Sequence, residues 1–287
     1  MKNSFFMTPE GMNDTDVWTR IYEAKTYGTV VPAKIVRRKE IQGQGGAWEL
    51  EFPEIPGVTG LVPESQNGLP EGTPMSALVG SIINVKILGV DRQEGIAACS
   101  RKEAVDVSIA KLMSAVVVGD EIPAVVKFIR NRNMYLDIGG GIILRIPSEK
   151  ARLSHGVPVD AQYSQGDIVE VVVTEMDRIE KNITVEFSSP WTKWALSRGE
   201  ILMGTVVTIR DKLAFIRVKP GIVGLVSYNA WDYFQIGDEL MFQVNACTPQ
   251  NRKLHLTMWN PEKAKKRRRA MAIAKGRNMN QKIIVNN

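Results

Sequence analysis

The sequence contains little of the chemistry from which metal sites and catalytic centres are built. Among 287 residues there are two cysteines, Cys99 and Cys247, and two histidines, His155 and His255. The cysteines lack the close spacing of metal ligands, and their scarcity argues against a disulfide framework and is typical of a reducing compartment. Two histidines leave little material for histidine-based catalysis. We therefore expect a cytoplasmic protein without a metal or other cofactor.

Long apolar runs are missing as well. No run approaches the roughly 18 to 20 apolar residues that cross a bilayer, so we expect no membrane span. The opening residues 1–11 (MKNSFFMTPEG) lack the apolar centre of a secretory signal. Hydrophobic residues make up 44% and charged residues 24% of the chain, as in ordinary globular proteins. The length suits two domains or three small ones.

Motifs of known catalytic sites are also lacking. The run Gly139–Gly141 is not followed by the Lys-Ser or Lys-Thr pair of a phosphate-binding loop. No nucleophile stands in a recognised motif with a histidine and an acid. Glu49 and Glu51 share one face of an expected strand, but no partner residues accompany them, so a solvated face explains the pair. We expect no enzymatic activity.

Positive charge is concentrated at one end of the chain. Residues 262–287 hold nine Lys or Arg and one acid, a net charge of +8, whereas the whole chain carries +6. The remaining residues are therefore nearly neutral. Asn260 can cap a helix and Pro261 suits its first turn, so we predict a basic helix and tail over 260–287. Such a tail can bind a polyanion like RNA or serve only as a solvated helix.

The sequence repeats itself three times. Each copy opens at a glycine before a Val/Ile-rich strand, passes a glycine-containing bend, restarts at another glycine and ends on a short alternating strand. The last two landmarks lie 20, 22 and 20 residues apart in the three copies. Regular spacing of this kind indicates one structural unit that is repeated three times. The opening, restarting and closing landmarks are Gly28, Gly80 and Ser100 in the first copy, Gly119, Gly166 and Ser188 in the second, and Gly199, Gly237 and Thr257 in the third.

The pattern within each copy predicts strands. Val169, Val171 and Val173 alternate with polar residues, which is the period of a strand with one buried face. Glycines at fixed places mark bends where a small sheet curls into a barrel. A five-stranded oligonucleotide-binding (OB) barrel has this size and strand number. We predict an all-β fold with a helical segment at 1–25, tandem barrels at 26–103, 117–189 and 198–259, short helical linkers and the basic tail.

Together these residues resemble the S1 RNA-binding motif and the repeats of the bacterial ribosomal protein that gave the motif its name. The third copy is the clearest, with 199–206 (GEILMGTV), 213–218 (LAFIRV), 221–226 (GIVGLV) and 252–257 (RKLHLT). In the first copy, 60–65 (GLVPES) and 99–104 (CSRKEA) are similar. The resemblance covers residues 26–258. It implies OB-fold barrels, single-stranded RNA (mRNA or rRNA) as ligand, association with the ribosome, and a role in translation or RNA turnover.

The resemblance also implies a binding face. In that family the RNA stacks on strand aromatics, a position that falls on Trp48, Tyr135 and Phe215, and we expect Tyr135 and Phe215 to be exposed. The family's basic position near the last strand falls on Arg252. His255 alternates with Leu254 and Leu256 and so faces away from the core. The family's histidine is absent, because its position falls on Pro63, Pro147 and Ser227.

Basic residues recur near the first strand-to-strand turn of each copy, which indicates a ligand face, although such turns are often polar for other reasons. Stacking on an exposed aromatic contributes about 1–3 kcal/mol per base, and cations beside it follow the phosphates. The predicted RNA-binding residues are Lys34, Arg37, Arg38, Trp48, Lys127, Arg130, Arg132, Tyr135, Arg210, Lys212, Phe215, Arg217, Arg252, Lys265, Lys266, Arg267, Arg268 and Arg269.

Two alternatives stay open at this point. The nearly neutral body and the missing histidines also fit an adaptor whose barrels bind ribosomal or RNA-processing proteins, with only the tail contacting RNA. Binding of single-stranded DNA is a further alternative, because barrels of this type stack either nucleic acid. The sequence leaves the oligomeric state open.

Overall fold

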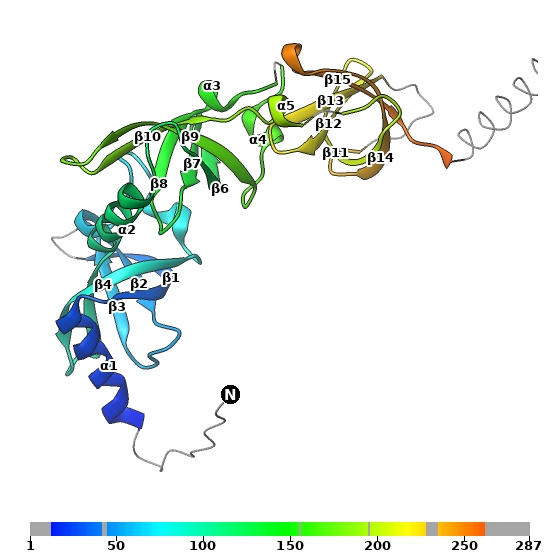
Figure 1. Ribbon diagram of the computed structural model, residues 1–287. Helices are drawn as coiled ribbons and strands as arrows, with labels where there is room; N and C mark the ends of the chain where they lie inside the picture. Colours follow the sequence, from blue (N-terminus) through cyan, green and yellow to red (C-terminus); the bar gives the residue numbers. More distant parts are fainter. Residues whose placement is uncertain (1–12, 42–44, 155, 195, 228–234, 262–287) are drawn as a thin grey trace, which may run out of the picture. The chain divides into compact units, whose positions relative to one another are not determined.

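The computed structural model describes residues 13–41, 45–154, 156–194, 196–227 and 235–261 of the chain. Strands dominate this part, and they form three five-stranded sheets that follow one another along the sequence (Figure 1). The prediction of an all-β fold with three repeats is therefore confirmed. Among the helices of these residues, none is long and apolar enough to cross a bilayer.

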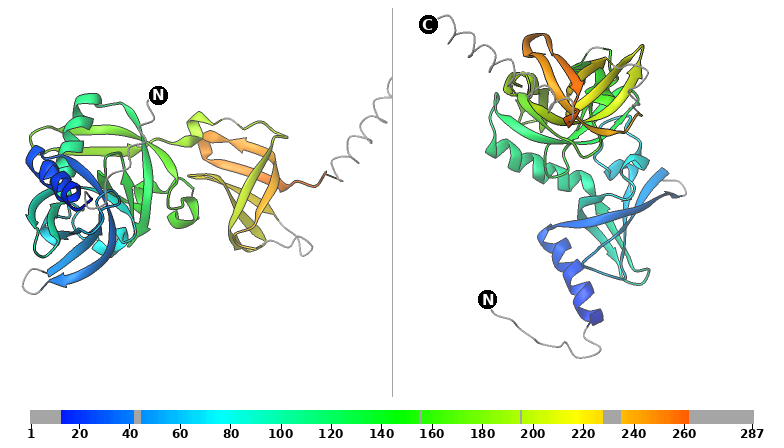
Figure 2. Two further views of the ribbon diagram at one scale, coloured as in Figure 1. Left: turned by 90° about the horizontal axis from the view of Figure 1, so that it is seen from below. Right: turned by 90° about the vertical axis from the view of Figure 1, so that its right-hand side faces the viewer.

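The first sheet closes into a barrel. Its strands are β1 (Val30–Ile41), β2 (Gly45–Glu51), β3 (Thr59–Pro63), β4 (Ile82–Asp91) and β5 (Ile96–Ser100), in the order β1-β2-β3-β5-β4, with short helices η1 (Glu64–Gln66) and η2 (Met75–Leu78) between β3 and β4. Neighbouring strands are antiparallel except β3 and β5, which run parallel. Helix α1 (Asn13–Tyr27) precedes the barrel and lies against β4, with Ile21 and Ala24 buried (Figure 2).

The third sheet repeats the topology of the first. Its strands are β11 (Ile201–Arg210), β12 (Leu213–Lys219), β13 (Ile222–Ser227), β14 (Glu239–Thr248) and β15 (Lys253–Met258), with η3 (Pro249–Asn251) between the last two. They close in the order β11-β12-β13-β15-β14, and β13 again runs parallel to β15. Alternate residues such as Val206, Ile216 and Phe242 fill the interior, as the strand period predicts.

The second sheet has the same strands but does not close. Helix α2 (Arg101–Ala115) leads into β6 (Glu121–Arg130), β7 (Asn133–Asp137), β8 (Ile143–Pro147), the short helices α3 (Ser148–Ala151) and α4 (Val159–Gln162), β9 (Ile168–Asp177), β10 (Asn182–Phe187) and the linker helix α5 (Pro190–Lys193). The spatial order is β10-β9-β6-β7-β8, so β8 and β10 are the two edges of an open sheet. Here the structure differs from the predicted closed barrel.

One position in the third strand of each repeat differs between the closed barrels and the open sheet. The register places Gly60, Leu144 and Gly224 opposite inward-facing residues of the second strand. A Cβ atom on Gly224 would lie 2.6 Å from Leu256 Cδ1 and 3.1 Å from Leu254 Cδ2, both on β15. A larger residue there would displace these two leucine side chains from their place in the third barrel. The second repeat has leucine at this position, and its third and fifth strands, β8 and β10, are not paired.

The chain divides into two compact units that do not coincide with the repeats. One contains Met1–Lys150 and Gln165–Ser188, and the other contains Ala151–Ser164 and Ser189–Asn287. A segment between β8 and β9 thus packs with the third barrel. The boundaries expected from the repeats at 103, 117, 189, 198 and 259 remain a prediction.

Gly221, at the start of β13, is where that segment meets the third barrel. Its N–H donates to the Gln162 carbonyl at 3.1 Å, and its carbonyl accepts from Trp191 Nε1 at 3.2 Å. A Cβ atom on Gly221 would lie 2.8 Å from both Leu153 Cδ1 and Tyr163 Oη, so only glycine fits. The Gln162 side chain is fully buried, and its amide bonds to the backbone of residues 153, 154 and 157.

Candidate nucleic-acid interface

The pairing registers define one outward row of residues across the third barrel. Thr208 of β11 pairs with Phe215 of β12, Phe215 with Leu225 of β13, and Leu225 with His255 of β15. Neighbouring strands place opposed side chains within contact distance. We call Thr208, Phe215, Leu225 and His255 the third-barrel row.

Phe215 is the aromatic centre of this row. Ala214 and Ile216 on either side of it are buried in the barrel, so the Phe215 side chain points outward and is partly exposed. His255 lies between the buried residues Leu254 and Leu256 and is exposed, which confirms its expected outward orientation. Phe215 was expected to be exposed, and the structure places it at intermediate burial; its role in RNA binding stays a prediction.

Cations lie close along the chain to Thr208, Phe215 and His255 of the third-barrel row. Arg210 ends β11, Lys212 and Arg252 lie in the turns before β12 and β15, and all three are exposed. Lys212 and Arg252 adopt left-handed backbone conformations with φ of 65° and 52°, which are typical of tight turns. Arg217 is partly buried, and its Nη1 donates to Ser164 Oγ at 2.5 Å. The arrangement offers a stacking surface with three exposed cations nearby.

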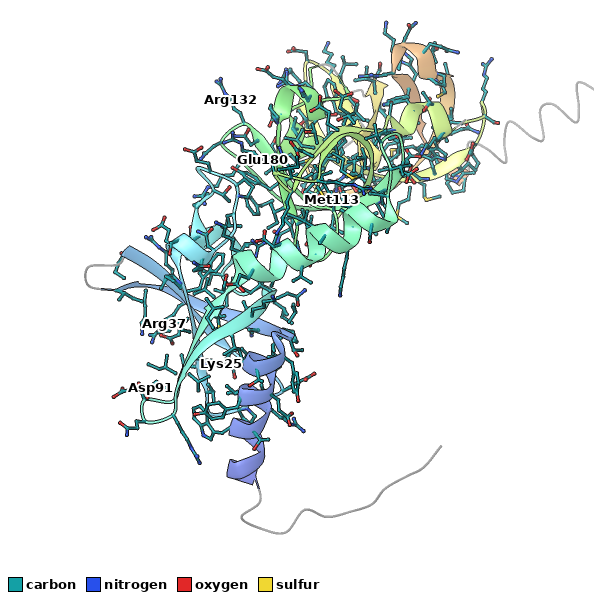
Figure 3. All side chains as sticks on the ribbon, turned by 60° about the vertical axis from the view of Figure 1, so that its left-hand side comes forward. Lys25, Arg37, Asp91, Met113, Arg132 and Glu180 are labelled. Carbon is teal, nitrogen blue, oxygen red and sulfur yellow. The ribbon has the colours of Figure 1, made fainter. Side chains whose placement is uncertain are left out.

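The equivalent row of the first barrel carries a carboxylate where the third has phenylalanine. Arg37 pairs with Glu49, and Glu49 with Leu61. Arg37 donates two hydrogen bonds to the Glu49 carboxylate, at 3.1 and 3.0 Å, and Lys39 Nζ lies 3.6 Å from it. The hydrogen bonds from Arg37 lower the pKa of Glu49. The Glu49 carboxylate is thus paired with two cations, and Figure 3 shows Arg37 on the first barrel.

Trp48 occupies the neighbouring, inward position. Its side chain is 0% exposed, and its Nε1 donates to the Met75 carbonyl at 2.9 Å. The expectation that Trp48 presents its ring to RNA is therefore wrong. The outward position belongs to the next residue, Glu49, because neighbouring residues of a strand point to opposite faces. The alternation of Trp48 with the buried Leu50 is the signal in the sequence that indicates the inward side.

The equivalent row of the second repeat is covered by the first barrel. Phe128 pairs with Tyr135, and Tyr135 with Arg145. The two rings stack with centroids 4.4 Å apart and belong to the apolar cluster of the first barrel. Arg145 Nη1 donates to the Glu71 carbonyl at 3.1 Å. Tyr135 is only 3% exposed, so its expected exposure is wrong, because packing between repeats buries it.

The other basic residues predicted for RNA remain on the surface of the first two repeats. Lys34, Arg38, Arg130 and Arg132 are exposed, and Lys127 is partly exposed. Arg38 pairs with Glu40 at 2.6 Å, and Lys127 pairs with Asp137 at 3.2 Å. Arg132 projects from the β6–β7 turn (Figure 3). The tail residues Lys265, Lys266, Arg267, Arg268 and Arg269 lie outside the described residues.

Leu225 and His255 are members of the row that the predicted site residues did not include. Their place beside Phe215 depends on the parallel pairing of β13 with β15. Parallel partners are far apart in the chain, so their register cannot be read from local alternation. Within the described residues, no group of three His, Cys, Asp or Glu side chains is placed to hold a metal ion.

Comparisons with known proteins point to one kind of domain. The family "S1 RNA binding domain" matches residues 116–188, which contain the second repeat. Small ribosomal subunit protein bS1 of Leuconostoc lactis is 24% identical over 274 residues, covering 89% of this chain and 61% of its own length. The bS1 protein of Streptococcus pneumoniae is 27% identical, with 67% of this chain and 50% of its own length covered. The chain thus spans about half to three-fifths of these relatives.

A similarity to a solved structure is weaker. A multidomain protein with nucleic acid binding domains from Streptococcus pneumoniae aligns with 81% of this chain and 74% of its own, at 11% identity and a TM-score of 0.28.

Proposed function

We propose that this chain, which carries an S1 RNA-binding domain and is similar to bacterial bS1 over most of its length, is a non-enzymatic protein that binds single-stranded RNA. Its ligand is mRNA or rRNA, and it acts in the cytoplasm, with the ribosome in translation or in RNA turnover. The observation that carries this proposal is the third-barrel row, where an outward phenylalanine lies among exposed cations.

The third barrel is the principal RNA site in this proposal. A base stacks on the ring of Phe215, and Leu225 and His255 extend the platform across β13 and β15. Arg210, Lys212 and Arg252 attract the phosphates. Stacking does not distinguish one base from another, so the site tolerates many sequences.

The first two repeats make a weaker contribution to RNA binding. In the first barrel the row has Glu49, paired with Arg37, in place of an aromatic, and in the second repeat Tyr135 is buried. Their exposed cations, such as Lys34, Arg130 and Arg132, add electrostatic attraction. These same two observations favour the second candidate function, an adaptor whose barrels bind ribosomal or RNA-processing proteins while only the tail contacts RNA.

The test is Phe215→Ala in the full chain, with binding to oligouridine measured at fixed salt. Loss of stacking should lower affinity by about 5- to 150-fold, which corresponds to roughly 1–3 kcal/mol. Leu213→Ala is the matched control, because Leu213 is a partly exposed residue of the same strand outside the row.

Three results would argue against the proposal. Unchanged RNA affinity in the Phe215 variant favours the adaptor function. An equal loss in the Leu213 variant indicates a general effect on the strand. Tighter binding to a matched deoxyuridine oligomer favours single-stranded DNA as the ligand.

A further inference from the structure

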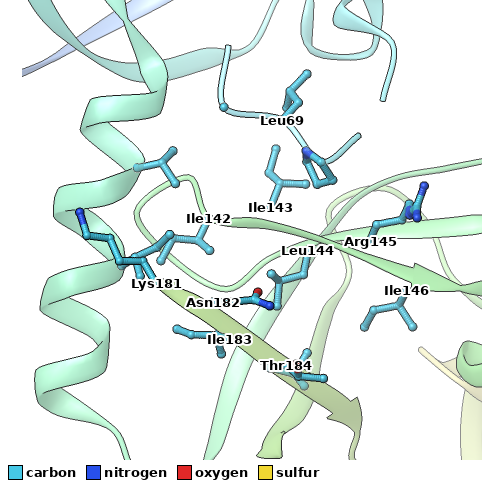
Figure 4. A pocket seen from close by; sticks show the side chains of 15 residues that line it. Leu69, Ile142, Ile143, Leu144, Arg145, Ile146, Lys181, Asn182, Ile183 and Thr184 are labelled. Carbon is cyan, nitrogen blue, oxygen red and sulfur yellow. The ribbon is translucent and has the colours of Figure 1, made fainter. Parts of the chain in front are cut away.

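The open sheet of the second repeat has a cavity between its two edge strands. In the first and third barrels the corresponding strands pair directly, as Leu61 does with Ala98 and Leu225 with His255. In the second repeat β8 and β10 are edges instead, and a cavity of about 480 Å³ lies along them (Figure 4). We call this cavity the β8–β10 seam.

The walls of the seam are mostly apolar. β8 contributes Ile146, β10 contributes Ile183 and Val185, and α2 contributes Val105 and Ile109. These side chains come from elements that flank the gap on several sides, as Figure 4 shows for β8 and β10. A cavity of this volume and composition is typical of a ligand site rather than of a packing defect.

Leu144 marks the position at which the open sheet differs from the two closed barrels. It lines the cavity and stands where the closed barrels have Gly60 and Gly224. In the third barrel that glycine leaves room for Leu254 and Leu256 of the fifth strand. The equivalent positions in β10 are the alternating residues Ile183 and Val185, which Leu144 would meet in the same way.

We propose that the β8–β10 seam binds an extended segment of a partner protein, which adds to the sheet as a strand between β8 and β10. Edge strands present backbone N–H and C=O groups that a new strand can pair with. The sister barrels use the same edges for parallel strand pairing. Alternate side chains of the segment would enter the apolar wall, and the others would face solvent.

Charge defines the partner further. Arg145 and Lys181 are the charged residues that line the seam, and no described carboxylate forms an ion pair with either. The segment therefore carries alternating apolar residues with acidic residues at one end. RNA fits less well, because most of the wall is apolar and only two cations face a phosphate backbone there.

The first test measures binding of a labelled synthetic peptide of alternating valine and threonine that ends in two aspartates. The full chain should bind it. The same peptide with alternate backbone nitrogens methylated should bind at least about tenfold more weakly, because methylation removes the N–H donors along one side of the peptide. Leu144→Gly should also weaken binding at least about tenfold, since it allows the seam to close.

A second pair of variants avoids the interior of the sheet. Thr184 lines the seam from β10 and is exposed. Thr184→Glu should weaken binding of the acidic peptide, whereas Thr184→Lys should leave it unchanged or strengthen it. Amide hydrogen exchange of β8 and β10 provides an independent readout, and Leu144→Gly should increase protection of both strands.

Several results would overturn the proposal. They are no binding of the peptide by the full chain, equal binding by the Leu144→Gly variant, and displacement of the peptide by oligouridine. Self-association that Leu144→Gly abolishes would show that a second copy occupies the seam instead. Because Phe215→Ala does not alter the seam, it should leave peptide binding intact, which separates this test from that of the RNA site.

Discussion

Arg101 donates a hydrogen bond from Nη2 to the carbonyl oxygen of Gly141, at 2.5 Å. Arg101 begins α2, and its Nη1 also donates to the carbonyls of Asn67 and Gly68, each at 2.9 Å. The side chain is 2% exposed. One guanidinium therefore joins the loop after η1 in the first repeat to the bend before β8 in the second.

Arg101→Met should destabilise the joined pair of repeats. Burial lowers the pKa of Arg101 to about 10, so the guanidinium is still charged at neutral pH. Its removal leaves three carbonyls without a donor, and we expect the free energy of unfolding to fall by about 3 kcal/mol. Chemical denaturation, with hydrogen exchange of β7 and β8, measures the loss.

The control is Lys102→Met, at the next and exposed position, which should change the free energy of unfolding by less than about 0.5 kcal/mol. Similar losses in both variants would refute this role of Arg101.

Glu49→Tyr should create RNA affinity in the first barrel. The change places an aromatic at the position equivalent to Phe215 and releases Arg37 and Lys39 from their ion pairs. We expect affinity for oligouridine to rise by about tenfold, measured by fluorescence anisotropy. The control is Glu51→Tyr, on the same strand outside the row. If neither variant binds better, the row does not mark the ligand face of the first barrel.

Deletion of residues 262–287 should reduce the salt dependence of RNA binding. This segment holds nine Lys or Arg and one acid. Each phosphate neutralised on a single strand contributes about 0.7 to the slope of log affinity against log salt. Several such contacts should therefore disappear, and a titration over a range of salt concentrations measures the change. Deletion of residues 1–11, which hold one lysine and one glutamate, should leave the slope as it is; an equal slope in both variants would show that the tail does not contact RNA.

Strand positions and the threefold repeat could be predicted because both depend on local features. Alternation along β9 and β14 and the glycines at the bends are visible in the sequence itself. The burial of Trp48 could also be predicted, since Trp48 and Leu50 are alternate residues on the inward face of one strand. The position equivalent to Phe215 is Glu49, one residue further along the strand, and one residue moves a side chain from one face of a strand to the other.

The burial of Tyr135 could not be predicted in this way. The alternation of its neighbours indicates a strand, but the covering surface comes from another repeat that is distant in sequence. The open second sheet lies between these cases. Alignment of the three glycine-containing bends shows that Leu144 replaces the glycines Gly60 and Gly224. Its consequence for the fifth strand can be inferred only from the structure, which shows the leucines packed around Gly224.

The contacts around Gly221 determine where the chain can be cut to produce a folded fragment. A fragment starting at residue 198 would lack Tyr163 and Trp191, and with them the hydrogen bonds that Gly221 exchanges with Trp191 and Gln162. Truncation there would strip away part of the wall that completes the third barrel. A shortened protein meant to isolate the RNA-binding barrel should therefore begin before residue 151, inside the preceding repeat.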